Sequence, residues 1–319
     1  MDKDAANGSA DQYIREKNLV VLQERIVTPP ERLGTVTPLS RDPLVIFNDS
    51  SLPVQRSMIA VNGSCRLEQL DFGVMLESDD TKMLFSHPLS TGETISFDSF
   101  NKVYTGLSRL LDQADLKANR IVRKWFFAKD IFRDYELINQ VRDGWFSTWF
   151  NGSDFIPAST GIQSLINRSG HISLEFLAID GKDIQIDQMH CSMQNEPIEY
   201  NKMFSRGILV SAPRGRIAFI SGTASTDERG EVKYVADIAR QFEHTLDCIA
   251  DLLESVGMGF ADIAQGMMWL KRKGDYQPCL EIARRYGFPI DRCLSLLDCN
   301  VCRDDWLCEI EVTAYKNKE

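Results

Sequence analysis

Hydrophobic residues recur at three- and four-residue steps in two stretches of the chain, and this spacing predicts two long amphipathic helices. The first stripe comprises Phe100, Val103, Leu107, Leu110 and Ala114. The second comprises Val235, Ile238, Phe242, Leu246, Ile249, Leu253 and Val256. Short apolar runs next to turn residues predict strands on both sides of each helix.

The two stripes belong to a weak internal duplication. Residues 110–129 and 252–271 match without gaps at an offset of 142 positions. Further along, His171–Ala178 resembles Asp305–Val312, which places Glu175 and Glu309 at the same position of their repeats. Each repeat is predicted to contain strands, a long helix, a strand, a short helix and a final strand.

This order predicts an α+β fold of two tandem units, each a mixed sheet with two helices on one face. We expect an irregular N-terminal extension over residues 1–53, a divergent first unit over 54–200 and a second unit over 201–319. The other face of each sheet is apolar and needs a partner, which is either the sister unit or another chain. On this ground we expect a homo-oligomer.

Composition narrows the classes of partner. The 319 residues include 36 Lys and Arg against 46 Asp and Glu, a net charge of −10, which argues against nucleic acid binding. We find neither an apolar run long enough for a spanning helix nor the apolar core of a signal peptide, so we expect a cytoplasmic protein. The sequons at residues 151–153 and 167–169 then have no consequence.

The eight cysteines and four histidines do not form a metal motif. Cys299 and Cys302 make a single CxxC pair without a second one, and the histidines lack HxxxH spacing. We therefore predict reduced structural thiols and no metal. Glycine-rich phosphate loops are also absent from the sequence, and we predict no cofactor.

The last predicted strand carries the best candidate for chemistry. Glu309 and Glu311 are two residues apart, so both side chains lie on one face of a strand that is otherwise apolar. A carboxyl group in an apolar cleft has a raised pKa and can donate a proton near neutral pH. The alternative is a solvated strand face, because edge strands often carry charge.

Three arginines lie near the segments that build this strand's surroundings: Arg206, Arg292 and Arg303. A guanidinium can hold a carboxylate through two parallel hydrogen bonds, so the set suits a small anionic substrate. The small polar run at 221–225, which includes Gly222 and Thr223, follows a predicted strand and could offer backbone donors to an anion. An ordinary turn is the alternative for this run.

Residues 205–316 resemble a YjgF/RidA domain. The resemblance rests on Ile220–Ser225, on Phe288-Pro289 with Arg292, and on Cys308–Ala314. It implies sheets packed around a central core, with clefts between neighbouring domains and a trimeric assembly. In RidA enamine/imine deaminases an arginine binds the substrate carboxylate and a glutamate of the last strand handles the proton. Arg292 and Glu309 match those positions.

A longer resemblance is to chorismatases, which join a divergent N-terminal half to a YjgF-like half. It rests on Ile156–Ile162, Phe204–Arg206, Ser221–Ser225, and Val301–Arg303 with Glu309. It implies cleavage of the enolpyruvyl ether of chorismate, in secondary metabolism, with release of pyruvate. Glu309 would be the general acid and arginines would hold the two carboxylates. Gly222 and Cys302 resemble residues of the branch that forms 3-hydroxybenzoate.

The chain departs from that pattern at residues 144–152. Chorismatases carry a polar, arginine-containing stretch there, whereas this chain has an aromatic run that includes Trp145, Phe146, Trp149 and Phe150. The run could form a more apolar pocket or belong to the core. The alternatives to a chorismatase-like enzyme are a RidA-like enamine/imine deaminase and a catalytically inactive tandem YjgF-like protein that binds a metabolite or a partner.

Overall fold

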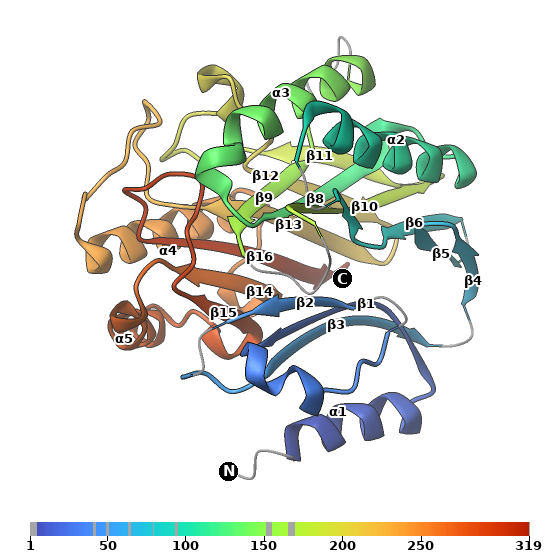
Figure 1. The fold of residues 1–319 in the computed structure, drawn as a ribbon, viewed down its shortest axis with the longest axis horizontal. Coiled ribbons are helices and arrows are strands. Elements are labelled where there is room, and N and C mark those ends of the chain that lie inside the picture. The colour runs from blue at the N-terminus through green and yellow to red at the C-terminus, as the bar shows by residue number, and fades with distance from the viewer. Residues whose placement is uncertain are drawn as a thin grey trace.

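The computed structural model describes residues 5–40, 43–48, 51–62, 65–78, 80–92, 95–150, 155–164 and 170–318, and both sequons lie outside these ranges. The described chain forms two large sheets and one small sheet, with helices on the outer faces of the large sheets (Figure 1). None of the helices in these ranges combines the length and apolar character that a membrane span requires.

The N-terminal segment is more ordered than the sequence suggested. After α1 (Ala5–Glu16), the strands β1 (Leu19–Thr28), β2 (Leu44–Phe47) and β3 (Gln55–Asn62) form a sheet of order β2-β1-β3. The prediction of an irregular extension that ends at residue 53 was wrong, because β3 pairs with β1. Strand β1 contains Glu24 and Arg25, whose burial no local pattern reveals.

The first unit is a seven-stranded sheet of order β4-β5-β6-β10-β8-β9, in which β7 pairs with β10. Its strands are β4 (Arg66–Leu70), β5 (Gly73–Ser78), β6 (Thr81–Ser86), β7 (Leu89–Ser90), β8 (Ile121–Ala128), β9 (Ala158–Gln163) and β10 (Ile172–Gly181). The helices α2 (Phe97–Gln113) and α3 (Ile131–Trp149) cover one face (Figure 1). Helix α2 begins at a capping box of Ser96 and Ser99, and its predicted stripe is buried.

The second unit repeats this order as β11-β12-β13-β16-β14-β15. Its strands are β11 (Gln185–Met189), β12 (Gly207–Ala212), β13 (Gly215–Thr223), β14 (Ile263–Leu270), β15 (Cys293–Leu297) and β16 (Cys308–Asn317), and its helices are α4 (Ile238–Ser255) and α5 (Tyr276–Tyr286). The tandem α+β fold is therefore confirmed. Because β11 pairs with β12, this sheet begins before residue 201.

Strand pairing corrects one detail of the duplication. In the first unit Glu175 of β10 faces Trp125 of β8, and in the second unit Glu311 of β16 faces Met267 of β14. Trp125 and Met267 are related by the offset of 142, so Glu175 corresponds to Glu311. The residue that corresponds to Glu309 is Ser173, since the segments before the last strands differ in length.

The N-terminal sheet resembles a truncated third unit. The strands β1, β2 and β3 follow one another as β8, β9 and β10 do, with a parallel pair first and an antiparallel return second. The short 3₁₀ helix η1 (Pro30–Thr35) connects β1 to β2, as α3 connects β8 to β9 in the first unit. The three sheets surround one apolar cluster to which each contributes, for example through Val27, Phe127 and Trp269. The apolar faces are thus covered within one chain, so they no longer argue for an oligomer, and the trimer stays a prediction.

A charged network lies inside this cluster. Arg25 donates to Glu175 (3.0 Å), and Arg123 pairs with Glu311. The Trp125 indole donates to Glu311 (2.9 Å), and its ring lies 4.1 Å and 4.9 Å from the guanidinium carbons of Arg25 and Arg123. Because all five side chains are buried, each charge depends on the others for compensation.

We expect Glu175→Ala to lower the free energy of unfolding by about 3 kcal/mol or more, because it leaves Arg25 buried without its nearest carboxylate. The matched control is Glu77→Ala, which removes the partner of Arg66, a residue with a side chain 73% exposed; its effect is expected to stay below about 1 kcal/mol. Urea unfolding of both variants measures the difference. Equal losses would show that the network does not stabilise the fold.

Candidate active site

A pocket opens between the two units, where β9 of the first lies beside β13 of the second. Backbone pairing joins Ala158 to Ser205, and the Ser159 amide donates to the Ser221 hydroxyl (2.9 Å). The pocket is lined by Phe126, Tyr135, Arg142, Ser159, Gly161, Tyr200, Lys202, Phe204, Arg206, Gly222, Ala224, Thr226, Cys302, Arg303, Trp306 and Glu309. Both halves of the chain are needed to form it.

Glu309 lies at the inner side of this pocket. Its strand β16 pairs with β14, opposite Trp269, and the side chain is buried (4% exposed). A register shift in β13 between Ile220 and Thr223 places Gly222 against the carboxyl group. A Cβ atom on Gly222 would lie 1.8 Å from Glu309 Oε1, so only glycine leaves room for this position of the acid.

The pKa of Glu309 is raised to about 8, first by burial and second by the negative charge of Glu311, with Arg123 acting in the opposite sense. Arg123 is already engaged by Glu311 and by the Thr160 hydroxyl. Within the part of the chain that the structure describes, the Glu309 carboxyl has no ion-pair partner. At neutral pH it is therefore mostly a neutral acid that can donate a proton.

Three of the predicted site residues lie elsewhere. Glu311 faces the charged network, and the Thr223 hydroxyl donates to the Ser221 carbonyl (2.9 Å). Arg292 is exposed and donates to the carbonyls of Ile263 (2.5 Å) and Ala261 (3.4 Å). The sequence places Glu309 and Glu311 on one face, as predicted, but the pocket reaches only the first of them.

Arg206 and Arg303 line the pocket as predicted, and backbone carbonyls hold both. Arg206 donates twice to the Asn195 carbonyl (3.0 Å and 2.7 Å), and Arg303 donates to the Gly230 carbonyl (2.6 Å). A carbonyl orients a guanidinium without neutralising it, so both side chains keep their positive charge for a ligand.

Cys302 also lines the pocket, and its thiol donates to the Gly161 carbonyl (3.2 Å). Burial and the nearby Glu309 raise the pKa of this thiol far above its usual range. It is thus a neutral group that shapes the pocket, and not a thiolate nucleophile. The Cys299 thiol donates to a different carbonyl of β9, that of Gln163 (2.7 Å), so the two thiols of the CxxC pair contact β9 at separate residues.

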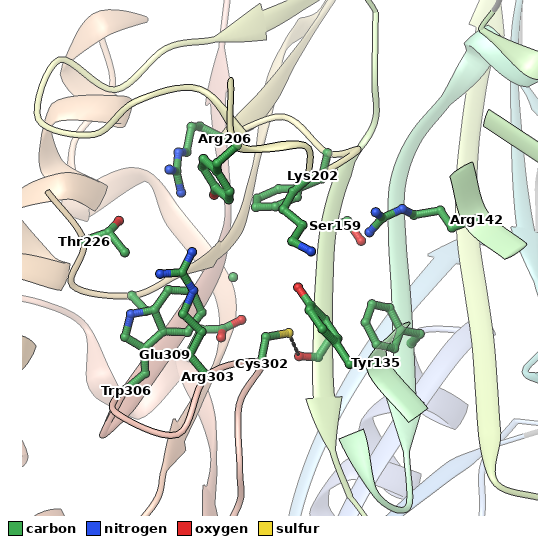
Figure 2. Close-up of a pocket in the computed structure, with 16 residues that line it drawn as sticks. Tyr135, Arg142, Ser159, Lys202, Arg206, Thr226, Cys302, Arg303, Trp306 and Glu309 are labelled. Carbon is green, nitrogen blue, oxygen red and sulfur yellow. Dashed lines mark hydrogen bonds between the residues drawn. The ribbon is translucent and has the colours of Figure 1, made fainter. Parts of the chain in front are cut away.

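Six further polar side chains line the pocket at positions that the sequence did not single out as site residues: Tyr135, Arg142, Ser159, Tyr200, Lys202 and Thr226. Arg142 lies on α3 just before the aromatic run, and its guanidinium points into the pocket opposite Arg206 and Arg303 (Figure 2). Lys202 lies between these two sides, with its amine 4.7 Å from the centre of the Tyr135 ring. A signal for Arg142 exists in the sequence, since it precedes the segment in which an arginine was expected.

The aromatic run itself belongs to the core. Its four rings pack against one another and against Tyr104 of α2, with ring centroids 4.9–6.5 Å apart. Of the two interpretations left open by the sequence, the apolar pocket lining is wrong for this run. The run instead fixes α3, and with it Arg142, against the first unit.

The electrostatics of the pocket favour an anionic ligand. Four cationic side chains (Arg142, Lys202, Arg206 and Arg303) face one acidic side chain, Glu309, among the described lining residues. The Asp143 carboxylate lies 2.8 Å from the Arg142 guanidinium and pairs with it. The contacts given above for Lys202, Arg206 and Arg303 are to an aromatic ring or to backbone carbonyls, which are neutral. Within the described ranges no group of three or more His, Cys, Asp or Glu side chains could hold a metal ion.

Comparison with known proteins agrees with this architecture. A crystal structure of a chorismatase aligns over 92% of this chain and 93% of its own length, with a TM-score of 0.71 and 18% sequence identity. The fold is that of a chorismatase. Residues 196–316 also match the family model described as Endoribonuclease L-PSP, which represents the YjgF/RidA domains.

Two shorter proteins of known structure cover a smaller part of the chain. A putative endoribonuclease from Thermotoga maritima is 19% identical over 41% of this chain and 98% of its own, with a TM-score of 0.34. TdcF from E. coli, solved with bound serine, is 18% identical over the same two shares, with a TM-score of 0.33. The chorismatase fold thus extends over nearly the whole chain.

We expect Glu309 to make a growing unfavourable contribution to stability as pH rises from about 4.5 to about 8. In this window Glu309 keeps its proton in the folded state and loses it in the unfolded chain, so the unfolded state binds fewer protons. One such group gives a slope of about 1.4 kcal/mol per pH unit. The Glu309→Gln variant lacks this titration. The free energy of unfolding of the variant minus that of the wild type should therefore increase with pH across the window. Urea unfolding at several pH values checks this, and a difference that does not vary with pH would contradict it.

Proposed function

We propose that this protein is a chorismatase-like enzyme that cleaves the enolpyruvyl ether of chorismate, or of a closely related cyclic diacid. The observation that carries the proposal is a buried, protonated carboxyl group at the inner side of a pocket with four cationic side chains. Such a ligand carries two carboxylates, which the cations can hold, and an enol ether, which an acid can protonate.

In the proposed reaction Glu309 donates its proton to the terminal methylene carbon of the enolpyruvyl group. The neighbouring carbon becomes an oxocarbenium-like centre, stabilised by the ether oxygen. Water adds to this centre and returns one proton to Glu309. The bond between the centre and the ether oxygen then breaks, the second proton of the water passes to that oxygen, and pyruvate leaves. Loss of water from the resulting ring diol gives a hydroxybenzoate-type product.

The other lining residues have supporting roles in this proposal. Gly222 leaves space for the acid, and Cys302 presents a neutral thiol next to it. The resemblance to chorismatases assigns these two residues to the branch that forms 3-hydroxybenzoate, which we adopt as the proposed product. Arg142, Arg206 and Arg303 would bind carboxylates. A trimeric state, a cytoplasmic location and a place in secondary metabolism remain predictions.

The alternatives have less support. A RidA-like deaminase would pair Glu309 with Arg292, but Arg292 is exposed and donates to backbone carbonyls outside the pocket. A protein that only binds a carboxylate would gain nothing from an uncompensated buried acid, which destabilises the fold at neutral pH. Hydrolysis of 2-aminoacrylate assays the first alternative directly.

The main test is Glu309→Gln, which keeps the shape of the side chain and removes the transferable proton. We expect the release of pyruvate from chorismate to fall by a factor of about 10²–10⁴. Since the acid must be protonated, kcat/KM of the wild type should be constant below about pH 8 and fall about tenfold per pH unit above it. Coupling pyruvate to lactate dehydrogenase measures both. Activity that survives the substitution, or that rises above pH 8, would exclude Glu309 as the acid.

A second test concerns the cations. Arg303→Met and Arg142→Met should each raise KM for chorismate by about 10- to 100-fold, because a charge-assisted contact to a carboxylate is lost. Arg272→Met is the control, because Arg272 pairs with Asp275 on the surface, and it should leave KM unchanged. If instead Arg292→Met abolishes activity while Arg303→Met leaves KM unchanged, the result favours the RidA-like arrangement, in which Arg292 and Glu309 act together.

A further inference from the structure

One wall of the pocket alternates aromatic rings with guanidinium groups. Arg206 Cζ lies 5.9 Å from the ring centres of both Phe204 and Tyr200, and Arg303 Cζ lies 5.8 Å from Tyr200 and 5.1 Å from Trp306. All four distances fall within the range of cation–π contacts. All five side chains line the pocket, so the alternation faces the ligand.

Tyr200 is the ring that both arginines share. It ends the 3₁₀ helix η3 (Pro197–Tyr200), and the chain then turns at Asn201, which has a left-handed φ of 59°. The Lys202 amide closes this turn by donating to the Pro197 carbonyl (2.9 Å). The backbone conformation therefore fixes where the ring enters the pocket wall.

The contacts of the two arginines show why a shared ring matters. Each guanidinium is anchored to a different loop, Arg206 to the Asn195 carbonyl and Arg303 to the Gly230 carbonyl. The Tyr200 ring packs on the second loop, since a Cβ atom at Gly230 would lie 3.3 Å from its Cδ1. Two like charges repel in a partly buried site, and a ring whose negative faces contact both offsets this repulsion.

We propose that Tyr200 is a positioning residue that sets the separation of the Arg206 and Arg303 guanidiniums, and thereby makes the pocket selective for ligands with two carboxylates. The proposal rests on the proposed function for the identity of the substrate, a cyclic diacid. Tyr200 acts here through its ring, which lies beside both guanidiniums, and its hydroxyl accepts a hydrogen bond from Arg206.

The test compares Tyr200→Met, which has similar length without a ring, with Tyr200→Phe, which keeps the ring. The surface control is Tyr315→Met, because Tyr315 is 42% exposed and lies at the end of β16. We expect Tyr200→Met to raise KM for chorismate about tenfold with kcat within about twofold of the wild type, while Tyr200→Phe and Tyr315→Met remain close to the wild type. Titration calorimetry with isophthalate and benzoate adds a binding readout: Tyr200→Met should weaken binding of the diacid about tenfold and leave that of the monoacid within about twofold.

Two patterns of loss overturn the proposal. Equal losses in Tyr200→Phe and Tyr200→Met would assign the effect to the hydroxyl, and equal losses for isophthalate and benzoate would indicate general damage to the pocket. If Tyr200→Met does not fold, Tyr200→Leu, which also lacks the ring, is tested with the same expectation. If the wild type binds isophthalate in the expected pattern but releases no pyruvate from chorismate, the proposed function fails and the role of Tyr200 stands.

Discussion

Arg25, Trp125 and Glu311 meet in the interior of the molecule, each from a different sheet, and the buried charges around them hold the three sheets together. The first unit contributes the neutral pair Arg123 and Glu175, to which the N-terminal sheet adds Arg25 and the second unit adds Glu311, so the absence of either of these two sheets alone leaves a net charge. Removal of one partner would leave a buried charge uncompensated, which is far more costly than the loss of a surface ion pair. The position of each unit is thereby coupled to that of the others.

The same network explains why one carboxyl group differs from its neighbours. Glu311 takes the attraction of Arg123, and Thr160 accepts a further hydrogen bond from that guanidinium. Glu309, two residues away on the same face, is left with burial and the repulsion of Glu311, so its pKa rises to about 8. The proton donor of the proposed reaction is thus a consequence of how the structural charges are compensated, and it lowers stability at neutral pH.

The two units have diverged at this position. Ser173 stands in the first unit where Glu309 stands in the second, and β7 pairs with β10 directly beside it, at Ser90. Glu175, the counterpart of Glu311, keeps its arginine partner in Arg25 of the N-terminal sheet. The internal repetition therefore preserves the structural charges in both units, while in the described chain the acid and its pocket belong to the interface between the units.

Local sequence predicted the long helices α2 and α4 and the strands beside them, because amphipathic periodicity records which face of an element is buried, and it placed Glu309 and Glu311 on one face of the last strand. The second helix of each repeat was predicted to be short, which holds for α5 but not for α3, a helix of 19 residues. It did not reveal the N-terminal sheet, since β1 buries Arg25 against residues 150 positions away. The tertiary structure decided which carboxyl group reaches the pocket, and it brought Arg142 of the first unit opposite Arg303 of the second. Compensation of charge and access to a pocket depend on contacts between distant segments, and no local pattern carries that information.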